Sequence, residues 1–318
     1  MLKKTTRALL VVTLAAAGLA LGASSASAAV VSIDLCAEAG TLALPGGVTV
    51  PIWGFAPAAP GPGGTLTCEG VAPRLPGPVL TVAQGDTVQV VVHNDLGEAV
   101  SFEAPGQRID QGAPLAPAHG TATYTFIADA PGTYLYESAA NAGRQLAMGL
   151  YGALIVRSPV ANQAYGTATT AYDREAILVL SAIDPAFNAN PGSFDLHQYN
   201  ATFWLINGRA YPQTDVVHAG AAGQRVLLRY LNAGYDNTTM ALLGLHEQVI
   251  ARDARPLNNP FLAGAETIPA GATEDAIATI PASGTRFALY NRQLHLTNGT
   301  PSNPSHSPGG MMTFLVVP

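Results

Sequence analysis

The sequence has 318 residues, of which 48% are hydrophobic and 11% are charged, and its formal net charge is −6. An acidic chain is a poor partner for nucleic acid and for anionic membrane surfaces, because both carry negative charge. At ~100–200 residues per domain, this length corresponds to two domains, each large enough to bury a core.

Residues 1–28 have the organisation of a secretory signal peptide. Cations at positions 3, 4 and 7 precede an apolar run over residues 8–20, and Ala26-Ser27-Ala28 offers a small-residue cleavage site. The run is shorter than the ~20 apolar residues that span a bilayer. We expect cleavage after Ala28 and a secreted protein, extracellular or periplasmic, with no membrane span. The exported chain then has 12 cations against 21 carboxylates, a net charge of −9.

The two cysteines, Cys36 and Cys68, lie near the start of the exported chain. An even number of cysteines in an exported protein favours a disulfide over two free thiols. The bridge would close a loop rich in Gly and Pro, and such a closure contributes on the order of 3–4 kcal/mol in the chain-entropy model. A metal held by the two thiolates is the alternative, which the absence of a nearby His in the sequence weakens.

The rest of the chain has the pattern of an all-β protein. It contains 33 Gly and 24 Pro, and short runs of β-branched or aromatic residues recur between turn signals. Such runs are typical of a sandwich or barrel, and several alternate apolar and polar side chains as half-buried strands do. We expect strands over residues 87–92, 122–127, 132–136, 151–156, 176–181, 225–231, 286–290 and 313–317.

An internal repeat indicates two copies of one unit. Residues 85–94, with the sequence GDTVQVVVHN, match residues 223–232, with the sequence GQRVLLRYLN, at an offset of 138. The stretch between the halves is polar and serves as a linker. We therefore expect one domain over residues 29–158, a linker over 159–173 and a second domain over 174–318.

Framework motifs follow one another along most of the exported chain. Residues 75–82 (LPGPVLTV) precede Gly85-Asp86-Thr87-Val88, and residues 131–136 (PGTYLY) and 148–156 (MGLYGALIV) come later. The second half has VIARDARPL at 249–257 and GGMM at 309–312. With these motifs the chain resembles the multicopper oxidases. The resemblance implies two tandem cupredoxin-like Greek-key β-sandwich domains, and it says more about fold than about activity.

The resemblance also shows where copper ligands belong. The family's trinuclear centre takes most of its imidazoles from four His-X-His motifs. The first should fall at residues 103–106 and the second at 136–139, which puts Glu103, Pro105, Glu137 and Ala139 at imidazole positions. No His-X-His occurs in the sequence.

The blue-copper pattern is incomplete as well. Such a site needs a Cys thiolate, two His and a weak axial Met. The family's His-Cys-His segment should lie near residues 290–293, and no Cys follows Cys68. We therefore expect no active laccase-type oxidase and no cofactor, copper being implied by the resemblance alone.

Four residues near the C-terminus could in principle form a soft copper site: His295, His306, Met311 and Met312. The alternative places His295 on a strand, His306 in a loop and both methionines in the core as adaptable apolar side chains. We favour the alternative.

Glu103 and Glu137 are expected to converge, because both replace histidines of one cluster in the family. Two adjacent carboxylates do not both ionise cheaply, so one stays protonated, a cation binds between them, or an Arg compensates. An ion pair between Glu137 and Arg144 is the favoured interpretation. A site for calcium, magnesium or manganese is the alternative.

Two functions follow as hypotheses. The first is an extracellular binding or scaffold protein with the multicopper oxidase architecture and no redox-active copper. The second is an oxidoreductase or metal-binding protein with an altered, oxygen-rich site. The resemblance also implies a possible homotrimer, while the sequence names no substrate and no other partner.

Overall fold

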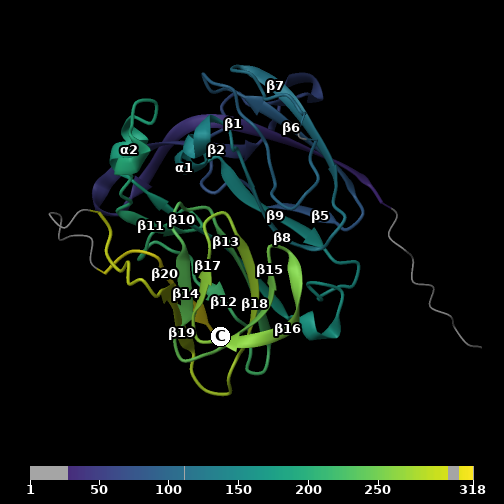
Figure 1. The fold of residues 1–318 in the computed structure, drawn as a ribbon, viewed down its shortest axis with the longest axis vertical. Helices are drawn as coiled ribbons and strands as arrows, with labels where there is room; N and C mark the ends of the chain where they lie inside the picture. The colour runs from purple at the N-terminus through teal and green to yellow at the C-terminus, as the bar shows by residue number, and fades with distance from the viewer. Residues whose placement is uncertain (1–27, 111, 300–307, 318) are drawn as a thin grey trace, which may run out of the picture.

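The computed structural model describes residues 28–110, 112–299 and 308–317. Residues 1–27 of the predicted signal peptide lie outside these ranges, so that segment stays a prediction. Within the described ranges, no helix is both long enough and apolar enough to cross a membrane. The chain folds into two β-sandwiches, one formed by β1–β9 and the other by β10–β20 (Figure 1).

The first sandwich pairs a four-stranded sheet, in the order β2-β1-β6-β7, with a three-stranded sheet, in the order β5-β9-β8. Its core lies between them, where Val88, Val90 and Val92 of β6 pack against Tyr136 and Leu154. A small hairpin of β3 and β4 and a short helix, α1, complete it. The bounds are β1 Val30–Leu44, β2 Val48–Pro57, β3 Ala59–Pro60, β4 Leu66–Thr67, β5 Leu80–Ala83, β6 Thr87–Asn94, β7 Gly120–Ile127, β8 Gly132–Glu137, α1 Arg144–Met148 and β9 Tyr151–Arg157.

The second sandwich pairs a six-stranded sheet, in the order β11-β10-β13-β18-β15-β16, with a five-stranded sheet, in the order β12-β20-β19-β14-β17. Leu228, Met240 and Leu289 lie in the core between them. The bounds are β10 Arg174–Ile183, α2 Pro185–Ala189, β11 Phe203–Ile206, β12 Val217–His218, β13 Arg225–Asn232, β14 Thr238–Leu242, β15 Glu247–Arg252, β16 Arg255–Ala263, β17 Glu266–Ile268, β18 Thr273–Thr279, β19 Arg286–Asn291 and β20 Met312–Val316.

Each of the strands expected from the sequence is present, with ends that differ by a few residues. The repeat is structural too, because β6 and β13 occupy matching places. β6 lies between a parallel neighbour, β1, and an antiparallel one, β7, while β13 lies in the same way between β10 and β18. The predicted disulfide is confirmed and joins Cys36 on β1 to Cys68, whose Cα atoms are 5.6 Å apart.

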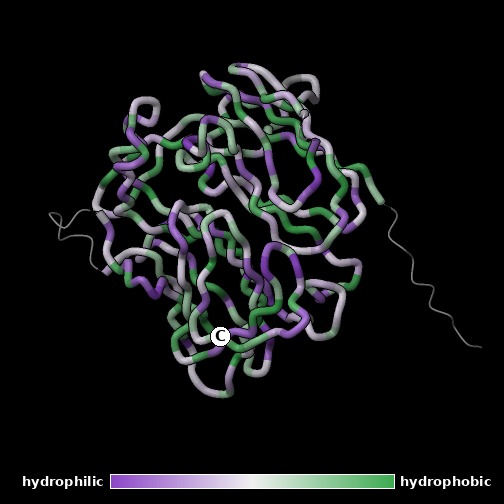
Figure 2. Tube along the Cα trace, viewed as in Figure 1, coloured by the Kyte–Doolittle hydropathy of each residue, from purple (hydrophilic) through white to green (hydrophobic). Residues whose placement is uncertain are grey.

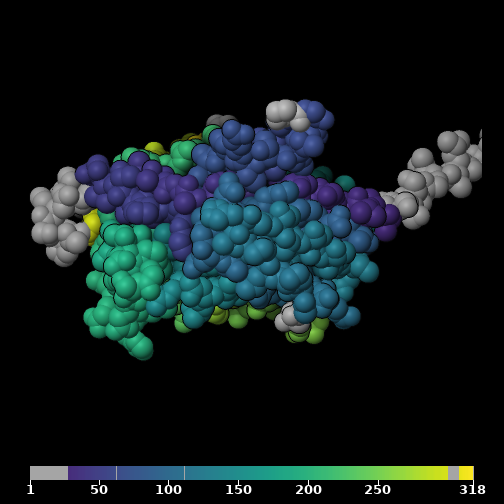
Figure 3. Space-filling view, turned by 90° about the horizontal axis from the view of Figure 1, so that it is seen from above, coloured from purple at the N-terminus to yellow at the C-terminus, as the bar shows by residue number. Residues whose placement is uncertain are grey.

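The two sandwiches are packed tightly against each other. The Thr133 hydroxyl on β8 donates to Asp275 of β18 at 2.6 Å and accepts from Arg229 of β13 at 2.8 Å. The apolar stretches in Figure 2 follow the strands into the sandwiches. From above, the green segment around α2 projects beside the purple β1 and β2 (Figure 3), where the Asn188 amide donates to the Pro51 carbonyl at 2.8 Å. The second sandwich therefore supports the first at several points.

Candidate functional site

Glu103 and Glu137 face each other at the edge of the first sandwich. Glu137 ends β8, and Glu103 lies in the long connection between β6 and β7. Each backbone N–H donates to the other residue's carbonyl at 2.8 Å, which forms an isolated antiparallel bridge. Residues paired in this way project their side chains from the same side of the pairing. The structure thus brings together the two carboxylates for which the resemblance predicts imidazole positions.

The two carboxylates differ in their surroundings. Burial raises the pKa of Glu137, and the nearby charge of Glu103 raises it further. Glu137 Oε2 is buried and has no hydrogen-bond partner within the described part of the chain. Glu103 is exposed at the mouth of a pocket. The pair therefore favours the uptake of a positive charge, from a proton or from a cation.

The expected ion pair between Glu137 and Arg144 is wrong. Arg144 is the first residue of α1, and its guanidinium donates to the carbonyls of Pro191 and Phe194, the latter at 3.1 Å. These acceptors follow α2 in the second sandwich, so the guanidinium points toward them and not toward Glu137. Arg144 thus serves as a tie between the sandwiches.

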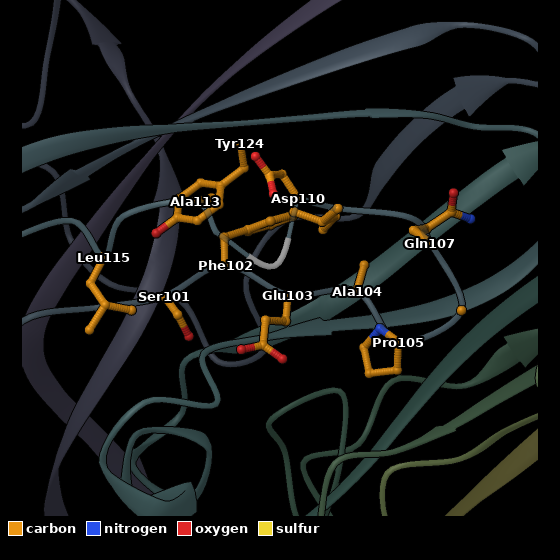
Figure 4. Close-up of a pocket in the computed structure, with 12 residues that line it drawn as sticks. Ser101, Phe102, Glu103, Ala104, Pro105, Gln107, Asp110, Ala113, Leu115 and Tyr124 are labelled. Carbon is orange, nitrogen blue, oxygen red and sulfur yellow. The ribbon is translucent and has the colours of Figure 1, made fainter.

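A pocket of about 260 Å³ opens beside Glu103. Its lining comprises Ser101, Phe102, Glu103, Ala104, Pro105, Gly106, Gln107, Ile109, Asp110, Ala113, Leu115 and Tyr124. In Figure 4 the Glu103 carboxylate and the Pro105 ring lie on one side of the connecting loop, and the Tyr124 ring lies on the other. The wall on the Glu103 side therefore offers a carboxylate oxygen at a position where the resemblance predicts an imidazole.

Hydrogen bonds occupy the second predicted His-X-His position, which sequence reasoning did not foresee. Ala139 donates its N–H to the Ser101 hydroxyl at 3.0 Å, and the Ser138 hydroxyl donates to Gln145 Oε1 at 2.6 Å. Gln145 in turn donates to Glu98 at 2.8 Å. Ser101, Ser138 and Gln145 are buried, so this network fixes the backbone at this position. The polar residues Ser138 and Gln145, seven positions apart, were the available signal in the sequence.

The donor set at these positions does not fit the family's trinuclear copper centre. Pro105 and Ala139 have no side-chain electron pair to donate. Among the described residues, Glu103 and Glu137 have no third His, Cys, Asp or Glu placed to complete a three-ligand group. Two carboxylates suit hard cations better than copper.

The C-terminal candidates are only partly brought together. His295 lies in the loop after β19, so its expected place on a strand is wrong. Its ring stacks on Trp204 with centroids 3.5 Å apart, and its carbonyl accepts the Met311 N–H at 3.2 Å. Burial lowers the pKa of His295, and its Nδ1 is buried without a partner among the described residues. These contacts hold the loop after β19 in place, and no local sequence pattern predicts them.

The methionines differ in burial. Met311 is 1% exposed in the core of the second sandwich, 3.9 Å from the Asn291 amide, whereas Met312 is half-buried on β20. His306 lies outside the described residues. Asn291 lies in the segment where the resemblance places the family's Cys, and its side chain is an amide. The residues in view therefore lack the donor that defines a blue-copper site.

The fold is of the cupredoxin type, and comparisons with known proteins agree with it. A family model described as multicopper oxidase matches residues 55–161. Laccase-3 of Oryza sativa subsp. japonica is 26% identical over 248 residues, which are 71% of this chain and 42% of that protein. Copper resistance protein A of Escherichia coli is 36% identical over 115 residues, 34% of this chain and 18% of that protein. The chain thus spans less than half the length of these relatives.

Solved structures agree on the fold. A blue copper oxidase from Nitrosomonas europaea has a TM-score of 0.76 at 22% identity, covering 91% of this chain and 86% of that one. A copper nitrite reductase from the same organism has a TM-score of 0.72 at 22% identity, covering 91% and 94%. The chain therefore has the cupredoxin-type fold of these proteins, and its residues 55–161 are similar to a multicopper oxidase domain.

Proposed function

We propose that this chain is an extracellular or periplasmic binding or scaffold protein that keeps the multicopper oxidase architecture without redox-active copper. The observation that carries the proposal is the donor set at the family's ligand positions. Pro105 and Ala139 cannot ligate, and Glu103 and Glu137 supply oxygen alone. Imidazole and thiolate are the ligands that bind copper tightly and tune its potential, so their replacement removes the basis of the family's chemistry.

Cysteine usage supports the same conclusion. Both cysteines are consumed by the disulfide between Cys36 and Cys68, which lies on the outer sheet of the first sandwich. A blue-copper centre takes its thiolate from the end of a cupredoxin domain, where Asn291 stands here. Without a thiolate at that position, the second sandwich cannot form the blue-copper site that would deliver electrons to a copper cluster.

Copper loading tests the proposal. The purified chain is incubated with Cu²⁺, dialysed, and assayed for copper per chain, for thiolate-to-copper absorption in the visible range, and for oxidation of a phenol. We expect substoichiometric copper, no intense visible band and no oxidase activity. A variant with histidine at positions 103, 105, 137 and 139 is the matched control, and it should retain more copper under the same protocol. A blue, copper-replete wild type that oxidises a phenol would overturn the proposal.

A hard-cation site at Glu103 and Glu137 is the second candidate function. It is favoured by the unpartnered Oε2 of Glu137 and by the raised pKa that Glu103 helps to produce. Calorimetric titration with Mn²⁺ and with Ca²⁺ tests it. We expect Glu137→Gln to abolish binding and Glu69→Gln, at an exposed position, to leave it intact. If millimolar metal produces no binding heat in the wild type, this candidate fails.

Export, the domain boundaries and assembly complete the proposal. Export is supported by the predicted signal peptide over residues 1–28, and the boundaries are those given by the repeat, with domains over 29–158 and 174–318. The homotrimer implied by the resemblance is also proposed, and light scattering tests it. A single monomer peak would remove the trimer while leaving the rest of the proposal in place.

A further inference from the structure

A group of potential metal ligands lies on the outer face of the first sandwich, away from the pocket at Glu103. Side chains alternate along a strand, and Leu35 and Ala37 of β1 face the core. Cys36 and Glu38 therefore share the opposite face, where Cys68 meets them from the segment after β4. One ligand atom from each of Cys36, Glu38 and Cys68 lies within 4.8 Å of the others.

Glu38 has little to neutralise its charge in this place. Its Oε1 is buried with no hydrogen-bond partner in the described part of the chain. The carboxylate of Asp95 lies nearby and adds negative charge. A cation bound beside Glu38 would give the buried oxygen a partner and balance this charge.

The neighbouring polar groups leave the position next to Glu38 open. His93 lies opposite Cys36 on β6, but its Nε2 is 2.8 Å from Asp34 Oδ1, so these two groups satisfy each other. A surface hollow adjoins Cys68 and is also lined by His93, Asp95 and His119. Solvent and small ions therefore reach the sulfur of the half-buried Cys68, whereas Cys36 is fully buried.

We propose that Cys36, Glu38 and Cys68 form a redox-gated site for one thiophilic cation such as Zn²⁺, closed by the disulfide and opened by its reduction. A dithiol reductant gives two electrons and two protons to the disulfide, which becomes two thiols while the reductant becomes a disulfide. Metal binding then releases the two thiol protons to solvent. Two thiolates and one carboxylate surround the ion, and water from the hollow fills the fourth position of a tetrahedral site.

The geometry requires only a small movement. The sulfurs must separate so that each lies about 2.3 Å from the ion. Cys36 is fixed on β1 between β2 and β6, so the displacement falls on Cys68, which belongs to a connection between strands. The carboxylate of Glu38 supplies a third ligand that the cysteine spacing alone does not reveal.

Cobalt substitution tests the proposal on the full chain. The protein is reduced with a dithiol under native conditions, freed of reductant without oxygen, and titrated with Co²⁺ and then with Zn²⁺. We expect one Co²⁺ per reduced chain, with a thiolate-to-cobalt charge-transfer band that Zn²⁺ abolishes. The oxidised chain should show no such band, and Cys68→Ser should lose it in the reduced state.

A role for the Glu38 carboxylate distinguishes this site from two thiols that bind metal adventitiously. Glu38→Gln should weaken Co²⁺ binding by at least about tenfold, the lower end for loss of a group that tunes a metal site. Glu69→Gln, which changes an exposed carboxylate beside Cys68, is the matched control and should bind as the wild type does. Equal affinities in the two variants would overturn the proposal. So would the absence of the band in reduced wild type, or loss of near-ultraviolet circular dichroism on reduction that metal does not restore.

Discussion

The two sandwiches use one strand in two ways. Asn94 at the end of β6 donates to the Glu98 carbonyl at 2.8 Å and accepts from the Leu96 N–H, while Asn232 at the end of β13 donates to the Asp236 carbonyl at 2.8 Å and accepts from the Gly234 N–H. The repeat thus preserves the turn that follows the strand. The strand interiors differ, because Arg229 occupies the position equivalent to the half-buried Val91.

This difference in sequence reflects the packing of the second sandwich against the first. The outer face of β6 carries His93 and lies at the surface, whereas the matching face of β13 is covered by the first sandwich. Arg229 is 1% exposed there and binds Glu175 at 2.6 Å and Asp275 at 3.0 Å. The equivalent strand therefore lies at the surface in one half and at a buried interface in the other.

Removing the buried cation should have the largest effect. Arg229→Met leaves Asp275 and Glu175 without their shared partner, and loss of one member of a buried ion pair costs about 3–5 kcal/mol. Denaturant unfolding should show this loss of stability. Val91→Met at the equivalent position of β6 should change stability by less than about 0.5 kcal/mol, as surface changes do. Equal effects would mean that the interface does not depend on the ion pairs.

Reducing the disulfide should have the next largest effect. The Cys36–Cys68 bridge has a sequence separation of 32, and opening it should cost about 3–4 kcal/mol in the chain-entropy model. At ~2–4 °C per kcal/mol, the melting temperature should fall by several degrees. Calorimetry with and without a dithiol measures it, and two free thiols in the denatured, unreduced chain would contradict the prediction.

The conserved turn offers a matched pair of variants. Asn94→Ala and Asn232→Ala each leave buried carbonyls without a donor, which costs about 1–3 kcal/mol. Because Asn94 donates to three carbonyls and Asn232 to two, denaturant unfolding should show a loss at Asn94 that equals or exceeds the loss at Asn232. A clearly larger loss at Asn232 would contradict this prediction.

The pH dependence of stability should arise in part in the second sandwich. Burial raises the pKa of Glu247 to about 7 and that of Glu274 to about 8. The folded state therefore keeps these protons at pH values where the unfolded state has released them, so stability falls as the pH rises from about 4.5 through 7 to 8. Glu247→Gln should flatten this slope, by up to about 3 kcal/mol across the window, since one pKa unit corresponds to about 1.4 kcal/mol. Thermal melts at several pH values, with Glu69→Gln as the control, check it.

The sequence was sufficient for features that are local. Alternation over a few residues predicts β6 or β13, and the offset of 138 predicts their equivalence. β1 was missed because Ala, Gly and Glu interrupt its alternation and because its partner, β6, is distant along the chain and parallel to it. Parallel pairing of distant segments leaves no local turn signal.

The candidate site shows the same limit. The approach of Glu103 to Glu137 followed from the resemblance, since the family's motifs fix both positions. The hydrogen-bond acceptors of Arg144 could not be predicted in this way. They are backbone carbonyls 47 and 50 residues away, and every residue has a backbone carbonyl. The stack of His295 on Trp204 joins a loop to β11, and no sequence pattern in either segment predicts this contact.

That stack gives the second sandwich an optical reporter. The chain has two tryptophans, Trp53 and Trp204, and the imidazole of His295 lies parallel to the Trp204 indole with 6° between the planes. A protonated imidazole in van der Waals contact quenches indole fluorescence, whereas a neutral one quenches it weakly. Because burial lowers the pKa of His295, the emission of Trp204 should dim only at a pH below that at which a free imidazole charges. The fluorescence intensity of Trp204 therefore reports whether a charged His295 lies against the indole, without any added label.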